Sequence, residues 1–143
     1  MIANNHVRQK VLEFLQKKFQ DQQLTIEQWF NGRPTFVDFE EHTPAVAVFI
    51  DECMADSVSF CGMELSADLN IQIYLKSGND AQAKLDKFAE FILQSLTGDE
   101  YILSVVDTLQ FAKYSYDQDS QQVSWHTATM TFNVTYSVEV NNE

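Results

Sequence analysis

Residues 127–140 alternate between polar and apolar side chains. Of all features of the sequence, this pattern most limits the folds that the chain can adopt. Its apolar positions are Ala128, Met130, Phe132, Val134, Tyr136, Val138 and Val140. Successive side chains of a strand point to opposite faces, so a period of two predicts a long strand with one buried and one polar face. A lone strand is unstable in water, and the chain is therefore expected to build a sheet.

Other segments predict the remaining strands of that sheet. Residues 65–75 repeat the alternation, whereas residues 45–50 are apolar throughout, which is typical of a strand covered on both faces. A short strand at 26–30 is expected to end at the turn signal Asn31-Gly32. Residues 102–116 predict a turn and then a strand, joined to the last strand by a polar loop at 117–122. The sequence leaves three alternatives for residues 51–62: they extend the preceding strand, cross an edge of the sheet or form a loop.

Two segments show the apolar period of a helix. The first runs to about Phe19 with Asn4 or Asn5 as its cap, and the second follows Asn79 or Asp80 and stops at Gly98. This order of elements predicts one α+β domain over residues 1–143. Its sheet is mixed or mainly antiparallel, and the two helices pack on one face.

The balance of charge excludes whole classes of partner. Of 143 residues, 9 are Lys or Arg and 21 are Asp or Glu, giving a formal net charge of -12. Such a surface repels phosphate, so neither specific nucleic-acid binding nor anionic membrane binding is expected. Apolar stretches are all shorter than the roughly 20 residues that cross a bilayer. Cys53 and Cys61 are too few for a disulfide framework and match no zinc motif.

Reactive groups are scarce, which argues against an enzyme. One alternative is a small acidic metal-dependent hydrolase that uses His42 with Glu40, Glu41 and Asp51, although this spacing matches no ligand motif. Another is a monomeric protein-binding module whose acidic face meets a basic partner. We expect no catalytic residues, no metal ligands and no cofactor.

Two stretches carry a resemblance to a known family. Trp29-Phe30-Asn31-Gly32-Arg33-Pro34, an acidic loop and then Pro44-Ala45-Val46-Ala47-Val48 resemble the tail terminator proteins of long-tailed phages, in particular the minor tail protein U family of lambda-like phages. Tyr114-x-Tyr116, an acidic loop, Trp125 and a strand ending at Thr135-Tyr136 resemble the closing hairpin of that family. The resemblance covers roughly residues 6–139, and residues 53–61 and 138–143 depart from it.

The resemblance implies a structural role without chemistry. Members of this family form a six-membered ring on the finished tail tube, stop its polymerisation and present the surface that the head-completion protein joins. The implied partners are further copies of the chain, the tail tube protein and the head-completion protein. The implied locations are the head-proximal end of the virion tail and, during assembly, the cytoplasm of the bacterial host.

The loop at 32–43 is the candidate subunit or partner interface. Arg33 of one subunit is expected to pair with Asp38, Glu40 or Glu41 of the next, with Phe36 or Phe39 packed nearby. The alternative is an ion pair within one chain. The last strand and residues 102–116 are weaker candidates, as a sheet edge to which a neighbour adds a strand.

Six copies would carry a formal charge of 6 × -12 = -72. Exposed like charges are screened beyond about 10 Å at 0.1 M salt, so salt or a divalent cation is expected to assist ring closure by screening. Part of this acidity is expected to line the channel, so that DNA passes through without specific binding.

Overall fold

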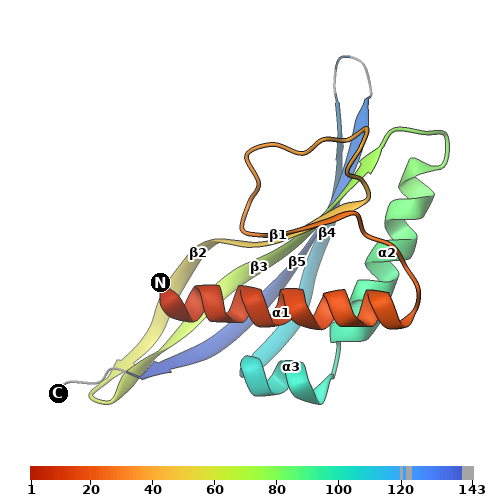
Figure 1. The fold of residues 1–143 in the computed structure, drawn as a ribbon. Helices are drawn as coiled ribbons and strands as arrows, with labels where there is room; N and C mark the ends of the chain where they lie inside the picture. Colours follow the sequence, from red (N-terminus) through yellow and green to blue (C-terminus); the bar gives the residue numbers. More distant parts are fainter. Residues whose placement is uncertain (120, 122–123, 140–143) are drawn as a thin grey trace.

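The computed structural model describes residues 1–119, 121 and 124–139 and shows a five-stranded sheet with three helices (Figure 1). In chain order the elements are α1 (Ile2–Asp21), β1 (Gln28–Asn31), β2 (Ala45–Ser59), β3 (Gly62–Lys76), α2 (Ala81–Leu96), α3 (Glu100–Val105), β4 (Thr108–Gln118) and β5 (Trp125–Glu139). The strands lie in the order β1-β2-β3-β5-β4. Only β1 and β2 run parallel among these neighbours, so the sheet is mixed.

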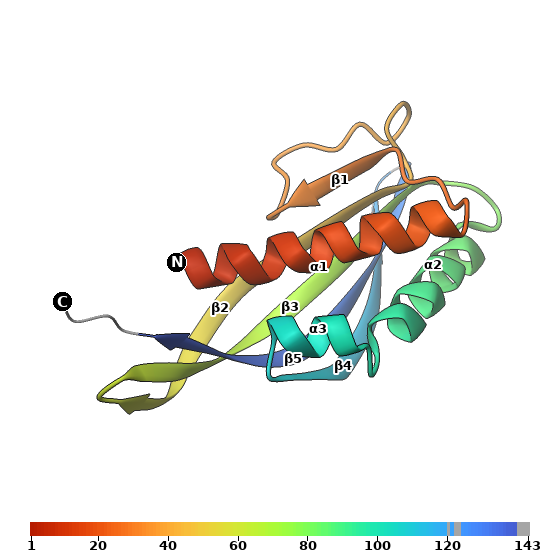
Figure 2. The same cartoon turned by 60° about the horizontal axis from the view of Figure 1, so that its bottom comes forward.

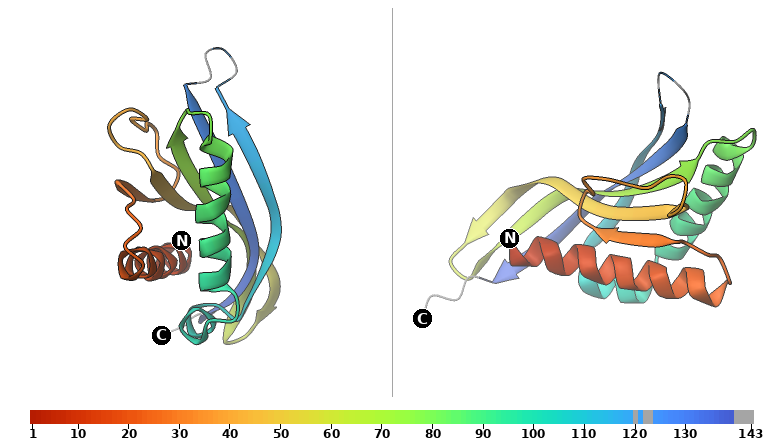
Figure 3. Two further views of the ribbon diagram at one scale, coloured as in Figure 1. Left: turned by 90° about the vertical axis from the view of Figure 1, so that its right-hand side faces the viewer. Right: turned by 45° about the horizontal axis from the view of Figure 1, so that its top comes forward.

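All three helices pack against one face of the sheet (Figures 1 and 2). The alternating apolar residues of β3 and β5 point to this face, where Leu69, Ile71 and Phe132 are fully buried. Burying one such side chain contributes about 1.5–3 kcal/mol. The sheet also curves around α2 (Figure 3, left). The predicted α+β class, with a mixed sheet and helices on one face, is confirmed; Val140 and part of the 117–122 loop lie outside the described residues.

The start of the first helix differs from the prediction. The helix begins at Ile2, so neither Asn4 nor Asn5 is its cap. Both asparagines have partners outside the helix instead: Tyr136 donates a hydrogen bond to Oδ1 of Asn4 at 2.5 Å, and Asn31 donates one to Oδ1 of Asn5 at 3.0 Å. These tertiary contacts replace the capping role that the local sequence favours.

The sequence predicts a turn where the structure has a third helix, α3. Asp99 caps it, because its Oδ1 accepts hydrogen bonds from the backbone N–H of Tyr101 and Ile102 at 2.9 and 3.2 Å. A helix of 6 residues is too short to show a helical period, so only the cap residue signals it. Ile102 is fully buried and ties α3 to the core.

Residues 51–62, left open by the sequence, extend β2 and turn back into β3. The pairing of β2 with β3 continues to the couple Ser59 and Gly62, with irregularities between Ile50 and Cys53 and between Ala55 and Ser57. The two long strands form a hairpin whose far end extends beyond the helices (Figure 3, right). The extended-strand alternative is therefore correct.

The last strand lies inside the sheet. β5 pairs with β3 along one side and with β4 along the other, so it cannot offer a free edge to a neighbouring subunit. That prediction is wrong for β5. For β4, which the strand order puts at one edge of the sheet, it stays a prediction.

Candidate assembly surfaces

The 32–44 loop joins the parallel strands β1 and β2 and covers part of the sheet face opposite the helices. Beneath it lies a second apolar cluster, formed by Ala45, Ala47, Phe49 and Tyr74 with Phe30, Val37 and Phe39 packed on it. The ring of Phe39 stacks on Trp125 at 5.6 Å and meets Tyr74 edge-on at 6.1 Å. Phe39 thus anchors the loop within its own chain.

Phe36 has the opposite environment from Phe39. Its side chain is 76% exposed, although it lies only three positions away in the same loop. A ring exposed to this extent gains free energy when a partner covers it. Of the two phenylalanines predicted for an interface, Phe36 is the one that the isolated chain leaves available.

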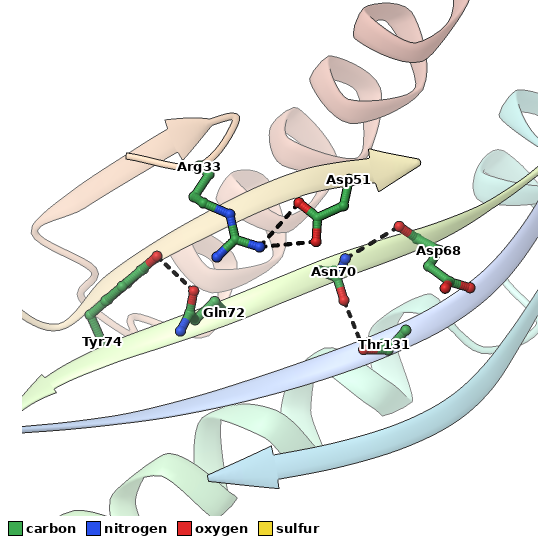
Figure 4. Close-up of polar contacts among 7 residues, drawn as sticks. All are labelled: Arg33, Asp51, Asp68, Asn70, Gln72, Tyr74 and Thr131. Atoms are coloured by element: carbon green, nitrogen blue, oxygen red, sulfur yellow. Dashed lines mark hydrogen bonds and ion pairs between the residues drawn. The ribbon is translucent and has the colours of Figure 1, made fainter. Parts of the chain in front are cut away.

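Arg33 is paired within its own chain (Figure 4). Its Nη2 donates to both carboxylate oxygens of Asp51, at 3.0 and 2.9 Å, and its guanidinium lies 4.2 Å from the ring centre of Phe49. Both ionic side chains are more than half exposed, so the ion pair contributes at most about 1 kcal/mol. Asp51 is not one of the loop acids that the sequence suggested as its partner.

The three acids of the loop have different roles. Oδ1 of Asp38 accepts hydrogen bonds from the backbone N–H of Glu40 and of Glu41, both at 3.1 Å, and so shapes the turn. Glu40 pairs with Lys76 at 2.7 Å, and this hydrogen-bonded carboxylate raises the pKa of the lysine. The side chain of Glu41 is exposed.

The part of the sheet that the loop leaves open is polar (Figure 4). A hollow of about 550 Å³ lies on it, and we call it the polar hollow. Its lining comes from β2, β3, β4 and β5: Asp51, Glu52, Met54, Ser66, Ala67, Asp68, Asn70, Lys113, Thr131 and Asn133. Its lining holds the carboxylates of Asp51, Glu52 and Asp68 and a single lysine, Lys113. Because Arg33 neutralises Asp51, a formal charge of −1 remains on this surface.

A buried hydrogen bond supports the polar hollow. Thr131 donates to Oδ1 of Asn70 at 2.8 Å, and the two residues are only 5% and 8% exposed. Nearby, Tyr74 donates to Gln72 at 2.8 Å, and burial raises the pKa of Tyr74 to about 12. The alternation in each strand predicted polar side chains here. It could not reveal the pairing of Asn70 with Thr131 in adjacent strands.

Two of the four residues of the metal-enzyme alternative have other side-chain partners. Asp51 is held by Arg33 and Glu40 by Lys76. Within residues 1–119, 121 and 124–139, no three His, Cys, Asp or Glu side chains come close enough to hold a metal ion. Over the same residues, no helix is both long and apolar enough to cross a bilayer.

The edge strand β4 is fixed to α2 by two tyrosines. Tyr114 and Tyr116 both donate to Oδ1 of Asp86, at 2.9 and 2.5 Å. Burial is the main cause of the raised pKa of Tyr114, whereas for Tyr116 it is the hydrogen bond to Asp86. The shared carboxylate holds this strand in place while its outer edge stays open.

Comparison with known proteins identifies the family. The chain is 28% identical over 119 residues to the tail tube terminator protein of Escherichia phage N15, an alignment covering 77% of this chain and 83% of the relative. Its fold is similar to that of a chain in the virion of a native gene transfer agent particle, with a TM-score of 0.50 and 12% identity over 88% of this chain and 92% of the other. The family model of phage minor tail protein U matches residues 2–136. The chain therefore belongs to the phage minor tail protein U family, and it is a structural protein of the virion tail, not an enzyme.

Proposed function

We propose that this protein caps the finished tail tube as a ring of six copies, stops tube polymerisation and presents the surface that the head-completion protein joins. The observation that carries the proposal is the similarity to the N15 relative, whose name is tail tube terminator protein. The alignment includes most of both chains, so the similarity is not confined to one shared motif. The partners are then further copies of the chain, the tube protein and the head-completion protein.

The surface of the isolated chain supports a role in assembly. Phe36 is 76% exposed and Phe60 is 92% exposed, and they lie at different places in the fold. The edge of β4 adds unpaired backbone groups that a neighbouring strand can use. Contacts with other subunits would cover both the exposed phenylalanine rings and the backbone groups of β4.

The 32–44 loop forms a subunit or partner interface in this proposal. Its candidate interface residues have different roles: Arg33, Phe36, Asp38, Phe39, Glu40 and Glu41. Asp38 shapes the turn of the loop, Phe39 and Glu40 hold the loop on its own sheet, and Phe36 and Glu41 make the outward contacts. Arg33 contributes only when it exchanges Asp51 for an acid of the neighbour.

The polar hollow and the sheet face around it line the channel in this proposal. Carboxylates, hydroxyls and amides cover that face, and its acids repel the phosphates of DNA. DNA then passes without specific binding. The ring needs no cofactor, and a divalent cation assists its closure only by screening charge.

Two measurements test this function. Light scattering across protein concentration, with and without magnesium, is expected to show a species of six subunits. Purified tubes incubated with the protein are expected to stop elongating when free tube subunits are added. Unchanged tube growth would refute the capping role, and tight DNA binding at physiological salt would refute the channel assignment.

Variants separate the outward contacts of the loop from its internal ones. Phe36→Ser and Glu41→Lys are expected to weaken ring formation without changing the fold, whereas Glu27→Lys, an exposed acid outside the loop, leaves assembly unchanged. Arg33→Glu alone also breaks the pair with Asp51. It is therefore compared with the double variant Arg33→Asp with Asp51→Arg, which restores this ion pair with its charges exchanged. Assembly restored by the exchange shows that Arg33 acts within its own chain, and assembly still lost shows a contact with the neighbour.

A further inference from the structure

The far end of the β2–β3 hairpin exposes large apolar side chains. Phe60 is 92% exposed and Val58 is 72% exposed, and Cys61 beside them is exposed as well. We call residues 58–61 the hairpin tip. The tip lies beyond the part of the sheet that the helices cover (Figure 3, right). A projecting strand pair with an uncovered phenylalanine favours insertion into a partner.

The strands that carry the tip are acidic. Glu52, Asp56 and Glu64 lie along the outer half of the hairpin, and residues 52–64 contain no Lys or Arg. This segment therefore has a formal charge of −3. A matching surface should combine an apolar floor with basic groups at its rim.

A surface with an apolar floor and two lysines at its rim lies between α1 and α3, and Glu13 and Asp21 belong to the same lining. A hollow of about 420 Å³ is lined by Glu13, Phe14, Lys17, Lys18, Asp21 and Tyr101, and we call it the α1/α3 hollow. The rings of Phe14 and Tyr101 stack at 6.0 Å and form its floor, with Tyr101 45% exposed. Nζ of Lys18 lies 5.4 Å from the ring centre of Phe14, so a cation borders the apolar floor.

The helix that forms this hollow is basic, unlike the chain as a whole. Four of the 9 Lys and Arg residues lie on α1, against two acids, so α1 has a formal charge of +2 in a chain of net charge -12. Arg8 and Lys10 account for this excess, because within the hollow Lys17 and Lys18 are balanced by Glu13 and Asp21. Attraction between an acidic hairpin and this helix offsets part of the repulsion between two copies.

The tip and the hollow lie at different ends of the molecule. The β2–β3 hairpin extends beyond the N-terminal end of α1 (Figures 1 and 3), whereas the hollow is formed by residues 13–21, in the C-terminal half of that helix. Pairing of β3 with β5 as far as Glu139 fixes the direction of the hairpin, so it does not fold back onto its own hollow. A hairpin tip can thus occupy only the hollow of another copy. Each copy has one hairpin tip and one α1/α3 hollow.

We propose that the hairpin tip of one subunit docks in the α1/α3 hollow of the next. Phe60 inserts against Phe14 and Tyr101, and Lys17 and Lys18 face the acids of the incoming hairpin. The contact is head to tail, and it closes a ring when the rotation between copies fits. This inference rests on the proposed ring and names the surfaces that hold it together.

Cross-linking tests the contact directly. The native Cys61 supplies a thiol at the tip, Cys53→Ser removes the other thiol, and Lys17→Cys places a new one at the rim of the hollow. A short bis-maleimide is expected to give a ladder of covalent oligomers that ends at the ring. Lys84→Cys, on the outside of α2, is the matched control and is expected to give no ladder. A ladder of equal strength from both variants, or from neither while rings are present, overturns the proposal.

A pair of exposed apolar residues tests the energetics. Phe60→Ser is expected to raise the concentration for half-assembly by about ten-fold or more, the effect of losing a central interface anchor. Ile2→Ser, at a residue 89% exposed at the start of α1, is expected to leave it unchanged. Lys17→Glu with Lys18→Glu is expected to weaken assembly most at low salt. Urea unfolding of each monomer checks that the fold is intact.

Failure of this contact is distinguishable from failure of the proposed function. If the Phe60→Ser variant forms rings normally and these rings still stop tube growth, the tip does not dock in the hollow, and the capping role stands. If its rings form but no longer stop tube growth, the tip contacts the tube and the proposed partner is wrong. If the wild-type protein stays monomeric with and without tubes, both proposals fall.

Discussion

Replacing Phe19 by alanine tests how the helices are held on the sheet. Phe19 is 1% exposed, and its ring meets those of Trp29, Phe88 and Phe91 at 5.4, 6.1 and 5.0 Å. One side chain therefore links α1, β1 and α2. Phenylalanine-to-alanine changes at such sites cost about 3–5 kcal/mol, because burial is lost and a cavity is left. Domains are stable by only about 5–15 kcal/mol, so this change removes much of the total.

The same substitution at Phe36 is the matched control. Phe36 is 76% exposed, so Phe36→Ala is expected to change the free energy of unfolding by less than about 0.5 kcal/mol. Urea unfolding followed by circular dichroism gives both values. At about 2–4 °C per kcal/mol, thermal unfolding of Phe19→Ala should shift down by about 6–20 °C. A loss below about 1 kcal/mol at Phe19, or equal losses at both sites, would refute the reasoning.

Three further predictions concern the sheet. Thr131→Val leaves Oδ1 of Asn70 without its buried donor and should cost about 1–3 kcal/mol in urea unfolding; an unchanged midpoint would contradict the role of this pair. Burial raises the pKa of Tyr136 from 10.0 to about 12, so the folded protein holds a proton that the unfolded chain loses. The contribution of Tyr136 to stability is therefore full below pH 10 and falls by at most about 1.4 kcal/mol per pH unit as the pH rises towards 12. The raised pKa values of Tyr74, Tyr114 and Tyr116 add to the same fall, so Tyr136→Phe should make the total slope shallower without removing it, and an equal slope would exclude a contribution from Tyr136. In Gly62→Ala the new Cβ would overlap the carbonyl oxygen of Val138 in the paired strand β5. Hydrogen exchange of the amides at this end of β3 and β5 should therefore speed up, and unchanged exchange rates would contradict the clash.

Much of the fold follows from local periodicity, because burial of one face repeats every two residues in β3 and β5. The short helix α3 shows no period, and only Asp99 signals it. Nor does local pattern reveal which polar groups meet across strands, since that depends on register. Asn4 illustrates this: the sequence favours a cap, but the fold places it beside Tyr136, 132 positions away.

The candidate interface shows the same limit. Phe36 and Phe39 are alike in the sequence, and only the packing of the loop on Tyr74 and Trp125 makes one an anchor and the other exposed. The sequence leaves open whether Arg33 pairs with a loop acid of the next subunit or within its own chain, and it gives no sign that strand geometry brings Asp51 to Arg33. The exposed hairpin tip gave no signal either, because Val58 and Phe60 have the alternation of any strand with a covered face.

The separation of the hairpin tip from the α1/α3 hollow bears on how assembly of this chain would end. A surface that is its own complement joins two copies and stops, whereas two different complementary surfaces join copies head to tail and leave one of each free on every open chain. Ring closure covers those last two surfaces without adding a copy. A closed ring therefore gains one contact over an open chain of the same number of copies, while the repulsion between copies of net charge -12 is shared by both. In the proposed ring every tip and every hollow is covered, so growth by this contact ends, and the two faces of the ring stay available for the tube and the head that the proposed function assigns to them.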